Sequence, residues 1–181
     1  MRKIIQLGLL ALALTAACAH AGDNRHCGGS VAQTGIPADL AHEVGDQTVE
    51  YAVEHAASPT VCSAGYESAK CGDFESAHKI FDKCIAAGYV GAMIWKASAL
   101  ENGAGGRSPD LAAAAELLRR AAMSGDSPYA TLGKLHYALA LRQGRGIPKD
   151  EIAARQWIEA AARDGNQDAI ELLRSDRHAS E

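Results

Sequence analysis

The 181-residue chain is predicted to fold as an all-α, right-handed solenoid of stacked antiparallel helix pairs. Three Ala-rich segments with apolar residues at helical spacing resemble one another, and each ends just before a glycine. Each segment follows another apolar helical stretch, and equivalent positions recur 37 to 40 residues apart. Helix pairs of this length cannot bury their apolar faces alone, so they must stack on their neighbours.

The first 21 residues have the character of an export signal. Arg2-Lys3 precedes a nearly unbroken apolar run over residues 4–17, and Ala19-His20-Ala21 fits a cleavage site. The run is shorter than the about 20 apolar residues that span a bilayer. An alternative route attaches a lipid to Cys18, although Thr15 stands where lipoprotein signals prefer Leu. We therefore expect export to the periplasm of a Gram-negative bacterium, soluble or lipid-anchored, or secretion.

The mature chain would hold about 160 residues, enough for one domain with a continuous core. Loss of Arg2 and Lys3 reduces the 18 basic residues to 16, against 22 acidic ones, a net charge of −6. No stripe of Lys and Arg is present, so nucleic acid is not an expected partner. We expect a monomer that meets a membrane only through the alternative lipid anchor.

The elements follow one another in a simple order. Residues 22–36 are Gly-rich and polar and indicate an extended leader. A helical pattern begins at Pro37, whose fixed φ suits a helix start, and runs to about Ala57. Ser58-Pro59 ends this helix or starts the next. The rest divides into a helix pair at 59–88, longer pairs at 89–125 and 126–165, and a closing helix with its tail at 166–181.

The second helices of the three pairs share three kinds of position. The small contact residue is Ala77, Ala114 or Ala154, the bulky apolar residue is Phe81, Leu117 or Trp157, and the terminal glycine is Gly88, Gly125 or Gly165. A glycine directly after a helix accepts left-handed geometry without the steric penalty of a Cβ. The same three kinds of residue therefore mark the same places in every pair.

On these positions the chain resembles two related repeat families. Residues 59–88 are similar to a tetratricopeptide repeat, and residues 89–173 are similar to its longer relative, the Sel-1-like repeat. The second resemblance is carried by Gly103, Gly105, Asp110, Ala114-Ala115, Ala121-Ala122 and Gly125, and again by Gly144, Gly146, Ile147, Pro148, Asp150, Ala154, Trp157, Ala161-Ala162 and Gly165. It implies a protein–protein interaction module. Exported members serve as adaptors, envelope regulators, host-interaction factors or immunity proteins that neutralise secreted lipase effectors.

In proteins of this kind, the first helix of each pair lines the concave surface. Transfer of the tetratricopeptide positions predicts a partner-binding surface made of Tyr66, Lys70, Ser98, Glu101, Asn102, Arg142 and Gln143. Leu135 and Leu139 are expected to add an apolar patch to the same face.

Besides Cys18 the chain contains Cys27, Cys62, Cys71 and Cys84, an even number that predicts two disulfides in an exported chain. Cys62 and Cys71 are nine residues apart on one predicted helix, about 13 Å, which exceeds the about 7 Å that a disulfide allows. Antiparallel packing brings Cys62 near Cys84 and leaves Cys71 for Cys27. The alternative is a set of free buried thiols.

The catalytic, phosphate-binding and zinc-binding motifs in the sequence are all incomplete. Ser76-x-x-Lys79 matches the acylating pair of penicillin-recognising enzymes, but the S-D-N and K-T-G companions are absent. Cysteine-rich relatives nevertheless make a β-lactamase or penicillin-binding enzyme the alternative function. The Gly144-x-Gly146 turn lacks the Lys-Ser/Thr pair of a phosphate loop, and no histidine pair has zinc-ligand spacing. We expect no catalytic residue, cofactor or metal, and few aromatics disfavour a third option, glycan binding.

Overall fold

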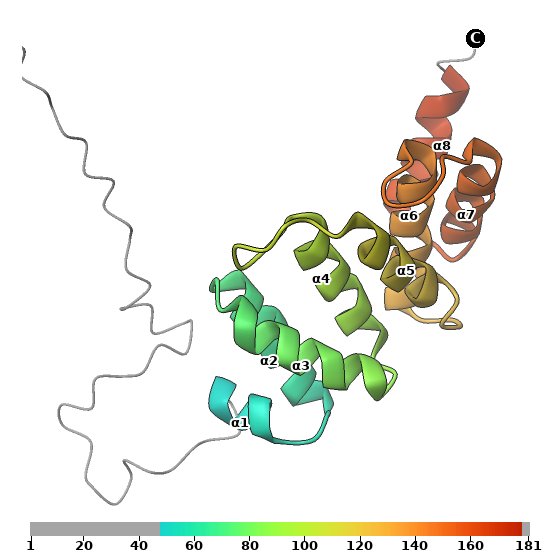
Figure 1. Ribbon diagram of the computed structural model, residues 1–181. Coiled ribbons are helices and arrows are strands. Elements are labelled where there is room, and N and C mark those ends of the chain that lie inside the picture. The colour runs from blue at the N-terminus through green and yellow to red at the C-terminus, as the bar shows by residue number, and fades with distance from the viewer. Residues whose placement is uncertain (1–47, 179–181) are drawn as a thin grey trace, which may run out of the picture.

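The computed structural model describes residues 48–178, which form eight α-helices and no strand. The helices are α1 (Val49–Glu54), α2 (Pro59–Lys70), α3 (Phe74–Ala86), α4 (Val90–Glu101), α5 (Leu111–Ala122), α6 (Pro128–Gln143), α7 (Glu151–Arg163) and α8 (Gln167–His178). Figure 1 shows consecutive helix pairs following one another from α1 (cyan) to α8 (red). The predicted all-α solenoid is confirmed for this part of the chain.

Helix α1 covers only part of the range predicted for the first helix. Thr48 has extended backbone geometry, and its side chain accepts the N–H of Tyr51 at 3.2 Å, so Thr48 is the N-cap of α1. The prediction of one continuous helix from Pro37 to Ala57 is therefore wrong. The predicted export signal, the leader, Cys18 and Cys27 all lie outside the described residues.

Side-chain caps define where the helices of each pair begin. The N-caps of α3, α5 and α7 are Asp73, Asp110 and Asp150, and each carboxylate accepts the N–H three residues further on at 2.9 to 3.1 Å. Ser58 and Ser127 cap α2 and α6 in the same way, with a proline directly behind each serine. Each cap satisfies a backbone donor that has no partner inside its helix, which fixes the first turn.

The helices pack in two rows of different density. The first helix α4 contacts both α2 and α6 directly, whereas α3, α5 and α7 show no comparable packing among themselves. The turn of a later pair lies instead against the start of the preceding second helix. A Cβ added to Gly105 would lie 2.9 Å from Cβ of Phe74, and one added to Gly146 would lie 1.9 Å from the carbonyl oxygen of Leu111. The first helices therefore form the more closely packed of the two rows.

Small side chains allow this close packing. The predicted small contact residues are all at most 1% exposed: Ala77, Ala114 and Ala154. The largest core cluster contains Phe81 and Leu117, and a second cluster around Leu135 and Ile158 joins α6, α7 and α8. Trp157 is only half-buried beside the second cluster. No helix in the described range is both long and apolar enough to cross a membrane.

A disulfide joins the helices of the first pair. Cys62 of α2 is bonded to Cys84 of α3, with their Cα atoms 5.9 Å apart, which confirms the pairing predicted from antiparallel geometry. Cys71, the C-cap of α2, is disulfide-bonded as well. Cys27, which we predict to be its partner, lies outside the described residues.

Candidate functional site

Two aromatic rings meet on the row of first helices, where α2 lies beside α4. Tyr66 of α2 packs against Trp95 of α4 with ring centroids 4.2 Å apart and ring planes tilted by 37°. The Lys70 ammonium lies 5.1 Å from the centroid of the Tyr66 ring, within the range of a cation–π contact. These residues, together with Ser98 and Asn102, are called the first-helix face below.

Exposed polar side chains continue this face along α4. Ser98 and Asn102 follow Trp95 by three and seven residues, so all three lie on one side of the helix. Both are exposed, and the Asn102 amide donates to the Ser98 carbonyl at 2.8 Å. Gln143, at the equivalent place at the end of α6, is exposed too. Ser98, Asn102 and Gln143 are thus accessible to solvent, and their role in partner binding stays a prediction.

Two other predicted binding residues connect neighbouring pairs instead. Glu101 forms an ion pair with Arg145 of the following pair at 3.2 Å. Arg142, at the equivalent position of the third pair, donates to both carboxylate oxygens of Asp176 in α8 at 3.1 and 2.9 Å. Their charged groups are already engaged within the solenoid, and they hold successive units in register.

The predicted apolar patch on α6 is wrong. Leu135 is only 5% exposed and belongs to the second core cluster with Ile158 and Ala169. Leu139 is half-buried and packs against the same cluster. The physical reason is that α6 contacts α4, α5 and α7, so most of its apolar side chains face other helices.

Sequence reasoning missed two residues on the first-helix row. Trp95 could have been found from its helical spacing to Ser98. His136 of α6 lies 41 residues after Trp95, the interval that also separates Gly105 from Gly146. Burial is the main cause of the lowered pKa of His136; Arg145 lowers it further, whereas Glu101 and Asp168 raise it. The ring therefore favours its neutral form.

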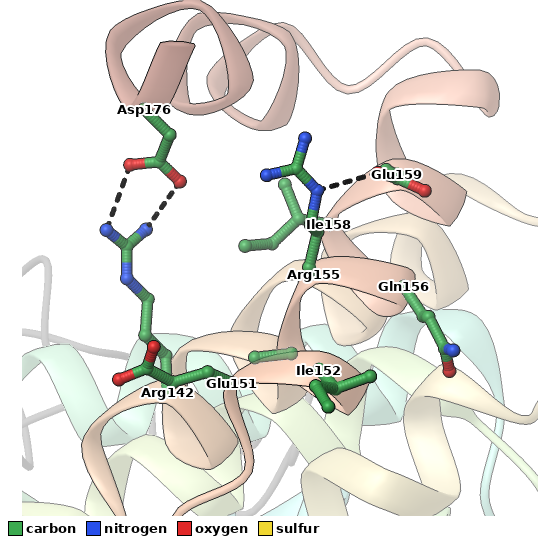
Figure 2. A pocket seen from close by; sticks show the side chains of 9 residues that line it. Arg142, Glu151, Ile152, Arg155, Gln156, Ile158, Glu159 and Asp176 are labelled. Carbon is green, nitrogen blue, oxygen red and sulfur yellow. Dashed lines mark hydrogen bonds and ion pairs between the residues drawn. The ribbon is translucent and has the colours of Figure 1, made fainter. Parts of the chain in front are cut away.

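A cleft of about 650 Å³ lies at the other end of the molecule, on α7. Figure 2 shows its lining, with the Arg142–Asp176 pair on one side and the Arg155–Glu159 pair, 3.1 Å apart, on the other. Ile152 is 77% exposed beside the cleft. On α3 and α5 a glycine turn covers the corresponding face, but no turn within residues 48–178 covers α7.

In the candidate acylating pair, Ser76 lies in the capped first turn of α3 and Lys79 is bound to an acidic neighbour. The Ser76 N–H donates to the capping carboxylate of Asp73 at 3.1 Å, in the first turn of α3. The Lys79 ammonium is bound to Glu75 at 2.8 Å on the exposed side of the helix. In the described range no group of three or more His, Cys, Asp or Glu side chains is placed to hold a metal ion.

Comparison with family models identifies the repeat. Residues 91–126 and 134–166 each match the Sel1 repeat. Comparisons with curated proteins and with solved structures give no match. The matched segments include α4–α5 and most of α6–α7, so they coincide with the stacked pairs described above. The chain therefore carries two Sel1 repeats, one in each of these segments.

Proposed function

We propose that the chain is an exported interaction module that binds a protein partner on the first-helix face. Sel1 repeats generally mediate protein–protein interaction and typically form non-catalytic scaffolds. The observation that carries the proposal is the contact between the Tyr66 and Trp95 rings, with exposed Ser98 and Asn102 beside it. Interface centres are enriched in aromatic residues, and a polar rim commonly surrounds them.

The role that we propose is that of an adaptor, an envelope regulator or an immunity protein that neutralises an effector. The predicted export signal supports action in the periplasm, either as a soluble protein or through a lipid on Cys18. Compact size also supports a dedicated partner, because the described residues provide about three helix pairs to form the surface.

The test places a bulky side chain on the proposed binding surface and leaves the core residues unchanged. Ser98→Arg places a long charged side chain next to the aromatic pair, and Ala86→Arg makes the same kind of change at an exposed position of α3. The wild-type chain first captures its partner from the native envelope, and the affinity of the purified pair is then measured for each variant. We expect Ser98→Arg to weaken binding at least about tenfold, since a clash at an interface centre costs more than about 1.4 kcal/mol.

Ala86→Arg should bind as the wild type does, and both variants should retain the helical circular dichroism of the parent. Equal weakening by both variants, or by neither, would contradict binding on the first-helix face. A captured partner also separates the roles, because an immunity protein must abolish the activity of the effector that it binds. An adaptor has no such effect.

A further inference from the structure

A second cleft lies on the other row of helices, between α3 and the turn that joins α4 to α5. Its volume is about 470 Å³. Three of its charged side chains come from α3 (Glu75, Lys79 and Asp82), one comes from α4 (Lys96) and one comes from the turn (Arg107). His78 of α3 also lines the cleft. Nothing in the first-helix face accounts for this concentration of charge.

His78 is a buried imidazole without a hydrogen-bond partner. The residue is 6% exposed, and neither ring nitrogen is bonded to any group in the described part of the chain. At the equivalent position of the next pair, Ala115 is 1% exposed, so helix packing there does not require a ring. Burial, followed by the positive charges of Arg107 and Lys96, lowers the pKa of His78. The neutral ring has one N–H donor to offer.

Among the charged side chains that line the cleft, one cation has no ion-pair partner in the described part of the chain. Lys79 is paired with Glu75 at 2.8 Å, and Lys96 is paired with Asp82. Arg107 is exposed, and the described residues provide no ion pair for it. The cleft therefore combines one unpaired guanidinium with one buried N–H donor.

We propose that this cleft binds a carboxylate, with the Arg107 guanidinium and a His78 ring N–H as its donors. The planar fork of a guanidinium matches the two oxygens of a carboxylate. A carboxylate carries one negative charge, which the unpaired Arg107 balances. A phosphate group carries more charge and would have to take Lys79 or Lys96 away from its acidic partner. The carboxylate belongs either to a peptide chain end or to a small free acid.

The experiment follows the imidazole signals of the full chain, with its disulfides oxidised, by NMR during titration with sodium acetate. The His78 signal is assigned by its absence in His78→Ala, a change that creates the residue found at Ala115 in the next pair. We expect a saturable shift of the His78 signal, with a dissociation constant on the order of 1 mM for so small a ligand. His136, the other histidine with a lowered pKa, serves as the internal control and should not shift.

Two arginine variants test the guanidinium. Arg107→Gln should weaken acetate binding about tenfold, because it removes a charge-assisted hydrogen bond. Arg120→Gln, at an exposed position of α5, should leave binding unchanged. An unshifted His78 signal, an equal shift at His136, or unchanged binding by Arg107→Gln would overturn the proposal. An equal response to sodium chloride, or tighter binding of inorganic phosphate than of acetate, would overturn it as well.

The source of the carboxylate is resolved by a matched pair of probes. Tetra-alanine with a free C-terminus is compared with the same peptide bearing a C-terminal amide. Binding of the free peptide more tightly than acetate, and loss of binding on amidation, assigns the site to a chain end. Acetate binding with no gain from the peptide assigns it to a small acid. Both outcomes support a carboxylate site, and neither depends on the partner proposed for the first-helix face.

Discussion

The pairs α2–α3 and α6–α7 have the same helix–turn–helix arrangement, but different bonds hold them together. In the first pair, the Cys62–Cys84 disulfide joins the two helices covalently. In the last pair, Tyr137 and Trp157 meet edge to face at 5.7 Å, and Lys134 is paired with Asp164 at 2.5 Å. Repeat geometry therefore does not require a particular bond, so the two ends of the described solenoid should fail under different perturbations.

The largest effect is expected where the last pair meets its neighbour. In Gly146→Ala the new Cβ would lie 1.9 Å from the Leu111 carbonyl oxygen, at a backbone φ of +71°. Left-handed strain and the clash together should reduce the free energy of unfolding by about 4 kcal/mol. The measurement is equilibrium urea unfolding followed by circular dichroism.

Gly125→Ala is the matched control for that variant. Its φ is +81°, but a Cβ there meets no atom within 4 Å. Only the backbone strain applies, so the loss should be about 1 to 2 kcal/mol. Equal losses in the two variants would show that contact between the Gly146 turn and α5 is unimportant.

Removal of the disulfide should have the next largest effect, and only on the first pair. Cys62→Ala/Cys84→Ala opens a link with a sequence separation of 22, which should reduce the free energy of unfolding by about 3 kcal/mol. Hydrogen exchange should show the loss of protection in α2 and α3, whereas α6 and α7 keep theirs, since each unit contacts only its neighbours. Uniform loss across all helices would contradict this independence of the two ends.

A smaller effect is expected for the ion pair between α6 and α8. Arg142→Gln removes a two-point contact with Asp176, but the two side chains are 40% and 31% exposed. Solvent screening limits the expected loss to about 0.5 kcal/mol, measured by urea unfolding. Arg155→Gln, which removes the 3.1 Å pair with Glu159 within α7, is the control and should cost less. A loss above about 2 kcal/mol for Arg142→Gln would mean that this contact is effectively buried.

Replacement of Ser76, a serine found at this position only in the first pair, should not change labelling by a penicillin. Ser76 stands where α5 and α7 have alanine, at Ala113 and Ala153. Incubation with a fluorescent penicillin should give no covalent label on the wild-type chain, and Ser76→Ala should behave identically, because Lys79 is bound to Glu75. A label that disappears in Ser76→Ala would favour the alternative enzyme and overturn the expectation of a non-catalytic module.

The features that the sequence predicts well are those that depend on local chemistry. The terminal glycines Gly88, Gly125 and Gly165 all have positive φ, because their position directly after a helix needs a residue without a Cβ. The Cys62–Cys84 bond followed from antiparallel geometry within a single pair. Neither inference required knowledge of how one pair is rotated against the next.

The features that could not be predicted from the sequence depend on how one helix pair is rotated against the next. The apolar residues of α6 face three other helices, so their spacing does not reveal that Leu135 is buried. Trp95 lies on the first-helix face through its contact with Tyr66 of another pair. His78 lines a cleft that exists only because the α4–α5 turn brings Gly105 and Arg107 to α3. Each is a property of two units together.

The uncovered face of α7 has a practical consequence for protein engineering. Helix α8 already follows α7 as α6 follows α5, so it occupies the place of a first helix in a further unit. Grafting a glycine turn and a second helix after α8 would cover Ile152 and lengthen the molecule without altering its existing interfaces. The described solenoid can therefore be extended by one repeat unit at α8.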